Sequence, residues 1–369
     1  MTRFIQLHLL TAYPPANLNR DDQGSPKTAK MGGYDRLRVS SQCLKRTWRT
    51  SEHFQYVLSG HIGTRTKEMG INIYDYLVGK GIEHDKALEW TKPIASVFGK
   101  LKQLSKKEKD ELKKLSETDR KKKELEEVEI EQLAFFDSEE EKAIFSLLDK
   151  LIEHDSAPEK DELSLLRQKV SDVDIAMFGR MLASSPAFNI EAACQVAHAI
   201  SVHPVVIEDD YFTAVDDLNT GLEDMGAAHI GETRFAAALF YSYICINREL
   251  LVENLGGDKA LANRAIRALT EAAVKVAPEG KQNSFASRAY ASYVLAEKGE
   301  QQPRSLSVAY LKPIMDRESQ DFEADAITAL IKQKDSFDKV YGDCADKRYE
   351  LNVPKEDGSL KELLDFVGQ

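Results

Sequence analysis

Residues 17–49 form a basic segment whose lysine and arginine side chains are of the type and spacing that suit binding of an anion. The segment carries eight basic and three acidic side chains, a net charge of +5, whereas the 369-residue chain carries −11. A basic segment in an acidic protein predicts a local site for a polyanion, because the surface as a whole repels one. The basic residues are Arg20, Lys27, Lys30, Arg36, Arg38, Lys45, Arg46 and Arg49.

The order of residues in this segment predicts how an anion would be held. Gly32-Gly33 would let the backbone approach a ligand closely, and Ser40-Ser41 begins a helix whose first amides favour an anion. Further positive charge follows along that helix at Lys45, Arg46 and Arg49. From these residues alone, a solvated helix face beside a long loop is an open alternative.

Catalytic and metal-binding signatures are weak in this chain. Asp21-Asp22 could form a metal or general-base pair, although adjacent carboxylates in a loop more often form a turn. The eight histidines lack metal-ligand spacing, the four cysteines are scattered, and no phosphate-loop or nucleophile-elbow motif is present. We therefore expect no metal, no cofactor and no catalytic site.

Two apolar positions outside the segment could contact bases. Tyr211-Phe212 lies in an acidic stretch and could stack on unpaired bases or pack in a small local core. The acidic neighbours repel phosphate, so these residues alone favour the packing interpretation. Met181 follows Gly179-Arg180 at the end of an expected strand, where a core position is the more common role.

Composition sets wider bounds on the protein. The length allows one large domain or two ordinary ones, and 42% hydrophobic with 30% charged residues is typical of a globular protein. No apolar run of about 18 residues and no signal peptide is visible, which predicts a cytoplasmic location and no membrane partner. The cysteines are expected to stay reduced.

The hydrophobic pattern of the first half predicts a strand followed by helices. Residues 3–12 alternate as a strand, 13–39 form a long loop, and Ser40 or Ser41 begins a helix that ends near residue 50. Helical composition follows over 54–170. Its Lys- and Glu-rich part, residues 100–132, is expected to be exposed rather than part of a core.

The second half returns to strands. The order strand, helix, strand, strand, helix, strand is that of an α+β, ferredoxin-like fold of the RNA-recognition-motif type. The elements that produce this order are strands at 173–182, 192–202, 235–247 and 286–296, an acidic loop or hairpin at 203–234, and a helix from Asp258 to about 277.

Six short strings along the chain resemble one protein family, the CasC backbone subunit of the type I-E CRISPR Cascade complex. Any one string is weak evidence, but six in order at compatible spacing are specific. The resemblance is weakest over 54–170 and beyond about residue 300. The strings are Asn17-Leu18-Asn19-Arg20-Asp21-Asp22, Gly32-Gly33, Ser40-Ser41-Gln42-x-Leu44-Lys45-Arg46, Gly179-Arg180-Met181, Phe212-Thr213-Ala214-Val215-Asp216-Asp217 and Glu253-Asn254-Leu255-Gly256-Gly257.

The resemblance implies a hand-shaped α+β protein. Its palm would be a ferredoxin-like, modified RNA-recognition-motif fold, with a helical fingers insertion and a hairpin or loop thumb. The implied parts are the palm at 1–53, 171–202 and 235–369, the last including the C-terminal region, the fingers at 54–170 and the thumb at 203–234.

The resemblance also implies a function and partners. Such subunits polymerise with further copies along the spacer of a CRISPR guide RNA, together with other Cascade subunits. The guide stays free to pair with a target DNA strand, so base pairing reads the sequence and the protein holds the backbone. The implied role is a non-catalytic RNA-binding scaffold in antiviral defence.

Individual residues match the family's functional positions. Met181 and Phe212 match apolar residues that flank a displaced base. After Gly32-Gly33 the family tends to be basic, whereas Tyr34, Asp35 and Leu37 interrupt the run here. The palm surface that grips the RNA backbone is matched by Arg20, Lys27, Ser40, Ser41, Gln42, Lys45, Arg46 and Arg49, to which we add Arg38 of the basic segment.

Two other functions are open alternatives. Related backbone subunits of type III effector complexes cleave target RNA with a loop aspartate, so Asp21 or Asp22 could make this chain a metal-dependent endonuclease subunit. The acidic surface could instead belong to a protein-interaction scaffold that binds no nucleic acid.

Overall fold

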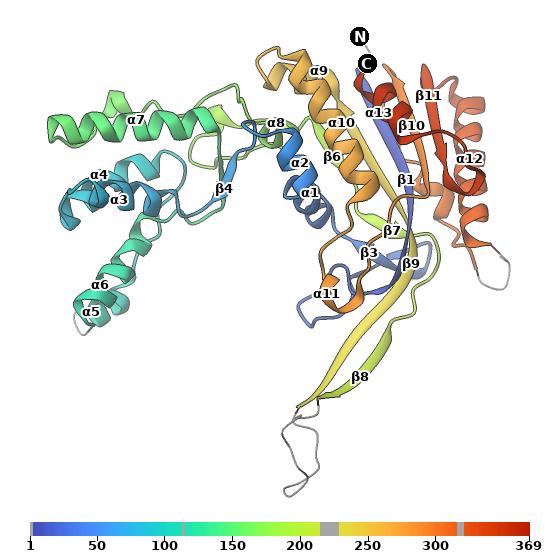
Figure 1. Ribbon diagram of the computed structural model, residues 1–369, viewed down its shortest axis with the longest axis horizontal. Coiled ribbons are helices and arrows are strands. Elements are labelled where there is room, and N and C mark those ends of the chain that lie inside the picture. The colour runs from blue at the N-terminus through green and yellow to red at the C-terminus, as the bar shows by residue number, and fades with distance from the viewer. Residues whose placement is uncertain (1–2, 113–114, 215–228, 316–320) are drawn as a thin grey trace, which may run out of the picture. The chain divides into compact units, whose positions relative to one another are not determined.

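The computed structural model describes residues 3–112, 115–214, 229–315 and 321–369 (Figure 1). The chain forms two compact units. The first comprises residues 1–57, 194–248 and 263–369, and the second comprises residues 58–193 and 249–262. Within the described ranges, every helix is too short or too polar to cross a bilayer.

The described residues of the first unit form a nine-stranded antiparallel sheet. The strand order is β11, β10, β1, β9, β7, β3, β2, and β6 and β8 also pair with β9. The strands are β1 (Phe4–Ala16), β2 (Thr28–Met31), β3 (Tyr34–Val39), β6 (Cys194–Val196), β7 (Ala199–Ser201), β8 (Glu208–Ala214), β9 (His229–Asn247), β10 (Tyr293–Gly299) and β11 (Lys347–Asn352).

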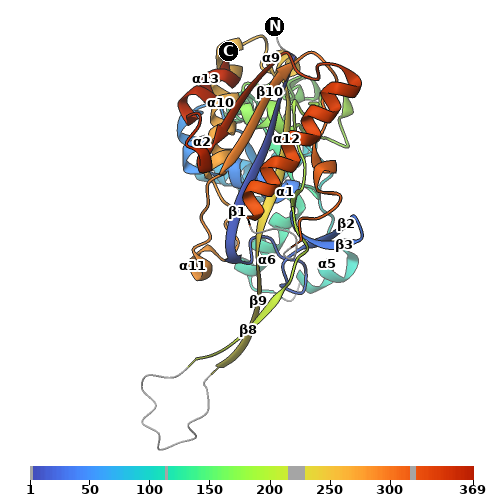
Figure 2. The same cartoon turned by 90° about the vertical axis from the view of Figure 1, so that its right-hand side faces the viewer.

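Strand β1 lies in the middle of this sheet and is buried on both faces. Ile5, Leu7 and Leu9 alternate with Gln6, His8 and Leu10, and all six side chains are buried. A strand buried on both sides needs cover on both sides, and α10 and α12 lie on opposite faces (Figures 1 and 2). The helices here are α1 (Ser41–Arg49), α2 (Glu52–Val57), most of α10 (Lys259–Lys275), α11 (Gln282–Phe285), α12 (Phe322–Tyr341) and α13 (Leu360–Gly368).

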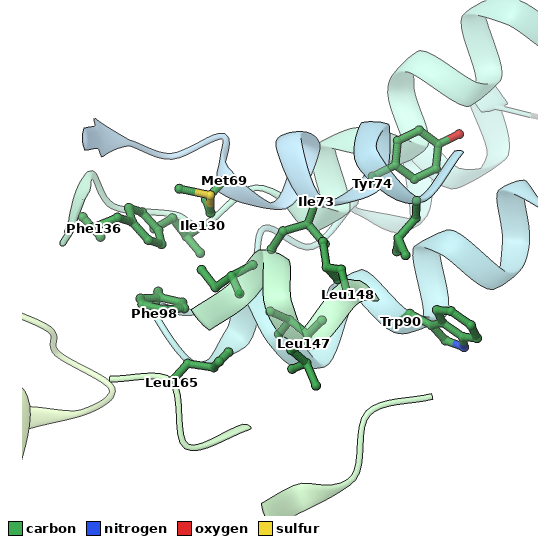
Figure 3. Packing of buried hydrophobic residues seen from close by; sticks show 14 of the residues in the cluster. Met69, Ile73, Tyr74, Trp90, Phe98, Ile130, Phe136, Leu147, Leu148 and Leu165 are labelled. Atoms are coloured by element: carbon green, nitrogen blue, oxygen red, sulfur yellow. The ribbon is translucent and has the colours of Figure 1, made fainter. Parts of the chain in front are cut away.

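The second unit is mainly helical and has its own apolar core. Ile73, Trp90 and Leu148 come from three different helices and are buried together (Figure 3). The elements are α3 (Met69–Gly79), α4 (His84–Ser96), α5 (Lys106–Leu112), α6 (Glu117–Glu124), α7 (Ser138–His154), α8 (Val173–Phe178), α9 (Arg248–Asn254, from its second residue) and the paired strands β4 (Thr64–Thr66) and β5 (Ala134–Phe136).

Several expected elements are confirmed. The strand expected at 3–12 corresponds to the first part of β1, the one at 235–247 lies within β9, and the helix after Ser40 is α1. Asp258 accepts a hydrogen bond from the backbone of Leu261 at 2.9 Å, which places it at the start of α10 as expected. The mixed architecture with a large antiparallel sheet agrees with the α+β class.

Two expectations about secondary structure are wrong. Residues 173–178 form helix α8, not a strand. Residues 173–177 are all buried, so this largely apolar run has no exposed polar face, and its period does not distinguish a helix from a strand. The loop expected at 13–39 contains the hairpin of β2 and β3. In addition, the last expected strand lies further along, at Tyr293–Gly299.

The charged tract at 100–132 is only partly an exposed excursion. Helix α6 has no buried residue, and its charges pair along the helix, for example Lys121 with Glu117 at 2.9 Å. However, Leu104, Val128 and Ile130 are buried, and Ile130 belongs to the core of the second unit. The expectation that this tract lies outside the core is therefore wrong at its ends.

Candidate nucleic-acid interface

The start of α1 is held by side chains from two other segments. Ser40 caps the helix, accepting a hydrogen bond from the Cys43 backbone at 3.3 Å. Asn19 Oδ1 accepts from the Ser40 backbone at 3.0 Å, and His198 Nδ1 accepts from the Ser41 backbone at 2.9 Å. The helix therefore begins at a fixed point between the 17–27 loop and the residue before β7.

Helix α1 has one buried face and one charged face. Leu44 and Trp48 are buried, as their four-residue spacing predicted. The Gln42 and Arg46 side chains are exposed, whereas Lys45 and Arg49 are half-buried. No acidic residue lies in the first turn, and Arg46 and Arg49 lie in the last turn. The exposed face therefore presents cations without an acidic neighbour in its first turn.

The loop between β1 and β2, residues 17–27, is shaped by Asp21. Its Oδ1 accepts hydrogen bonds from the backbones of Gln23 and Ser25, both at 2.9 Å. This is a local turn in which the carboxylate satisfies two amides. Across the loop, the Lys27 backbone donates to Asn19 O at 2.8 Å. The Asp21 carboxylate is thus committed to holding the loop, as the turn interpretation predicted.

A cavity of about 570 Å³ lies between this loop and α1. Arg20 and Arg46 supply positive charge to its wall, while Asp21, Asp22 and Glu279 supply carboxylates. Gly280 closes one side, because a Cβ there would lie 2.2 Å from the Leu18 carbonyl oxygen. The remaining lining residues are Leu18, Asn19, Gly24, Cys43, Thr47 and Thr50.

The Gly32-Gly33 pair serves the β2–β3 hairpin. Both glycines have positive φ, 62° and 85°, which a two-residue hairpin turn of type I′ requires. A Cβ on Gly32 would lie 1.8 Å from the Leu311 carbonyl oxygen, so the turn also packs closely against that backbone. The turn accounts for the positive φ of both glycines, and the contact with Leu311 gives Gly32 a further structural role. A phosphate contact at this backbone stays a prediction.

Not every cation of the basic segment reaches solvent. Arg36 is fully buried and donates to the carbonyls of Ser201 and Tyr310, both at 2.8 Å. Burial lowers its pKa from the ordinary arginine value. Arg38 is half-buried and donates through Nε to Thr28 O at 3.3 Å. The surface that an anion would meet therefore carries one charge fewer than the sequence indicates.

His198 is a polar residue that sequence reasoning missed. Its Nδ1 accepts the Ser41 amide, so the neutral ring carries its proton on Nε2. Partial desolvation by its neighbours lowers the pKa of His198, and the positive charges of Arg38 and Lys27 lower it further. An exposed imidazole beside two cations can donate Nε2–H to an anion. The sequence around His198 offers no motif, since only the fold brings this residue beside α1.

Phe212 lies on the β8–β9 hairpin of the first unit. It pairs with Gly231 across the two strands, and its ring covers that glycine. The side chain is 44% exposed. Tyr211, the next residue back on the strand, is 65% exposed and faces the other side of the hairpin. The expected Asp216-Asp217 lies outside the described residues.

Met181 lies in the second unit, after helix α8. It is 75% exposed, so the expectation of a strand-end core position is wrong. Its neighbour Arg180 is buried and pairs with Glu140 at 2.5 Å, which anchors the backbone beneath Met181. Met181 also lines a mostly apolar pocket of about 410 Å³ together with Phe98 and Leu133.

Comparison with known proteins decides the family. The family model described as CT1975-like protein matches residues 5–364, almost the whole chain. The chain belongs to the CT1975-like protein family. No curated protein matches the sequence of this family member.

Solved structures similar to this CT1975-like chain come from CRISPR complexes. One chain of a structure titled "CRISPR RNA-guided surveillance complex, pre-nicking" is 25% identical, with a TM-score of 0.81, and the match covers 99% of both chains. A chain from a "CRISPR RNA-guided surveillance complex" is 23% identical with a TM-score of 0.61, over 99% of this chain and 98% of that one. These findings confirm the resemblance to the Cascade backbone subunit.

Proposed function

We propose that this chain is the guide-RNA-binding backbone subunit of a CRISPR Cascade complex in antiviral defence. The observation that carries the proposal is the match over 99% of both chains, at a TM-score of 0.81, to a chain of an RNA-guided surveillance complex. The charged face of α1 supplies a surface of suitable chemistry. In this role the protein holds the RNA backbone, and base pairing with target DNA reads the sequence.

The palm of this subunit would be a ferredoxin-like core within the first unit. Four strands support this assignment, since β10, β1, β9 and β7 lie side by side and all run antiparallel. Helices α1 and α10 connect them in the order of a split βαβ fold. The fingers would correspond to residues 54–170 and the thumb to 203–234, with β8 and the start of β9 as its hairpin.

The proposed RNA grip combines three kinds of group. Arg20, Lys45 and Arg46 would neutralise phosphates, and hydroxyl and amide groups would position them. Ser40 is buried and acts mainly through the helix start, so its contribution would come from backbone geometry. The other proposed ligands are Lys27, Arg38, Ser41, Gln42 and Arg49, while Met181 and Phe212 would flank a displaced base.

A non-catalytic role fits the loop geometry better than an endonuclease role. Oδ1 of the Asp21 carboxylate already accepts two backbone hydrogen bonds, which gives this side chain a structural role in the loop. In the described part of the chain, no three potential metal ligands come together. We propose that further copies, other Cascade subunits, guide RNA and target DNA are its partners, and that it works in the cytoplasm.

Co-purification tests this function. The chain should be expressed with a CRISPR array and its partner subunits, and the RNA that accompanies it should be sized. The parent should carry guide RNA of one discrete length. Arg264→Ala, which removes an exposed arginine of α10, is the control and should carry the same amount. Arg46→Ala should retain less guide RNA. Protein free of RNA in every preparation would contradict the proposal and would favour the protein-interaction alternative.

A further inference from the structure

The β8–β9 hairpin extends beyond the rest of the sheet in the first unit (Figure 1). Strand β8 pairs with β9 and with no other described strand. A two-stranded hairpin is only marginally stable by itself, so its direction depends on contacts at its base. Those contacts decide where Phe212, on β8, lies relative to the loop that carries Arg20.

One side chain at the base of the hairpin reaches both strands and the loop. Arg234, on β9, donates from Nε to Asp209 Oδ1 of β8 at 2.8 Å, and its Nη2 lies 3.5 Å from Glu232 Oε1. Its Nη1 donates to Ser25 Oγ of the loop at 2.9 Å. The planar guanidinium suits this task because it offers several donors in a fixed geometry.

The loop contacts the same residue a second time through its backbone. Asn17 Nδ2 donates to Arg234 O at 2.8 Å and to Gly24 O at 2.9 Å. Asn17 is buried, so these bonds are shielded from water. The Ser25 backbone in turn donates to Asp21, which shapes the turn beside Arg20. Two hydrogen bonds at Arg234 therefore join the loop to the hairpin. The bond to the Arg234 carbonyl comes from the buried Asn17, and the bond from the Arg234 side chain to Ser25 is partly exposed.

We propose that Arg234 is a positioning residue that couples the 17–26 loop to the β8–β9 hairpin. Its side chain holds the two segments at one spacing, so that the RNA contact of the loop and the base contact of Phe212 occur in register. This inference rests on the proposed function. The Arg234 side chain is 43% exposed, so the link weakens with salt, while the Asn17 link persists.

Hydrogen exchange of the free protein tests the coupling without RNA. Removing the side chain in Arg234→Ala should speed exchange of the Gln23 and Ser25 amides about two- to five-fold, the effect of one exposed charged link. Arg264→Ala is the matched control and should leave these amides unchanged. Arg234→Lys keeps the positive charge but loses the planar guanidinium with its several donors. It should therefore restore only part of the protection of these amides from exchange.

A double-mutant cycle tests the route through the hairpin. Asp209→Ala should speed loop exchange less than Arg234→Ala, and adding it to Arg234→Ala should have little further effect. Fully additive effects of the two changes would contradict the coupling. Unchanged loop exchange in Arg234→Ala would also overturn it.

The complex with guide RNA separates positioning from direct binding. Arg234→Ala should bind the guide with an affinity within about three-fold of the parent's. In the parent complex, nuclease should cut the guide at regular intervals, and in Arg234→Ala the difference between cut and protected nucleotides should become smaller. A loss of affinity as large as that of Arg46→Ala would make Arg234 a direct ligand and overturn the proposal. If the parent binds no RNA, the proposed function fails, while the exchange result still decides whether Arg234 links loop and hairpin.

Discussion

The ring of Phe212 lies over Gly231, its partner across the β8–β9 hairpin. A Cβ on Gly231 would lie 2.3 Å from Cζ of that ring, far closer than two such atoms can approach. An aromatic ring over a cross-strand glycine covers backbone that would otherwise be exposed and fixes the ring in return. The glycine therefore decides where the proposed base-flanking side chain points.

We predict that Gly231→Ala displaces the Phe212 ring without unfolding the chain. The new methyl group needs the space that the ring occupies, so the ring must turn outward. Chymotrypsin should then cleave after Phe212 several-fold faster, because hairpin segments that lose cover become accessible. Thr233→Ala, on the same strand, should cleave at the parent rate, and an unchanged rate in Gly231→Ala would contradict the contact.

We predict that Lys45→Ala weakens binding of unrelated guides about equally. A phosphate contact carries no sequence information, so its loss should lower the slope of log affinity against log salt by about one unit. The measurement is a salt titration with two guides of different sequence. Lys339→Ala, an exposed lysine on α12, serves as the control and should leave the slope unchanged. A loss that depends on guide sequence would count against a backbone contact.

We predict that Arg36→Ala destabilises the first unit although Arg36 belongs to the basic segment. The change leaves the carbonyls of Ser201 and Tyr310 without their buried donor, which costs about 3 kcal/mol. Trp48 lies in the first unit and Trp90 in the second, so urea unfolding can be followed by Trp48 fluorescence in a Trp90→Phe background. The control is Arg46→Ala at an exposed position, which should change the free energy of unfolding by less than about 0.5 kcal/mol.

We predict that Asp172 makes the second unit less stable as pH rises. Burial raises the pKa of this carboxyl to about 7, despite hydrogen bonds from Ser138 that favour the charged form. The folded state then binds more protons than the unfolded state above the ordinary value of 3.8. The contribution of Asp172 to the free energy of unfolding is therefore fully present below pH 3.8 and is lost as pH rises through about 7.

The comparison that isolates this effect is Asp172→Asn. Trp90 fluorescence in a Trp48→Phe background reports the second unit, and unfolding free energies should be measured from pH 5 to 8. The difference between Asp172→Asn and its parent should shift in favour of the variant as pH rises. Exposed Glu153→Gln should follow its parent over this range. A difference that does not vary with pH would contradict the raised pKa.

We predict that Asp21→Ala loosens its loop and that neither loop aspartate supports cleavage. The Gln23 and Ser25 amides lose their acceptor, so their exchange should quicken, whereas Asp22→Ala should leave them unchanged. Assembled with guide and complementary target RNA in Mg²⁺, the parent should leave the target intact. Regularly spaced cuts that Asp21→Ala or Asp22→Ala abolishes would restore the endonuclease alternative.

Local signals in the sequence were enough for α1 and β1. Ser40 caps α1, the spacing of Leu44 and Trp48 turns one face inward, and the charged residues follow on the other face. The alternation in residues 3–12 likewise reveals a strand. These features depend on neighbours a few residues apart, so they can be inferred before the fold is known.

Tertiary structure decided which residues of the basic segment meet solvent and which positions meet each other. Arg36 and Arg46 have the same chemistry, yet β3 places Arg36 against Ser201 and Tyr310, while α1 leaves Arg46 exposed. Residues 173–178 form a helix that the sequence pattern did not reveal, because residues 173–177 are all buried and this largely apolar run shows no helical period. The links of Arg234 to Ser25 and of Phe212 to Gly231 depend on strand register, which pairs residues distant in sequence and leaves no local pattern.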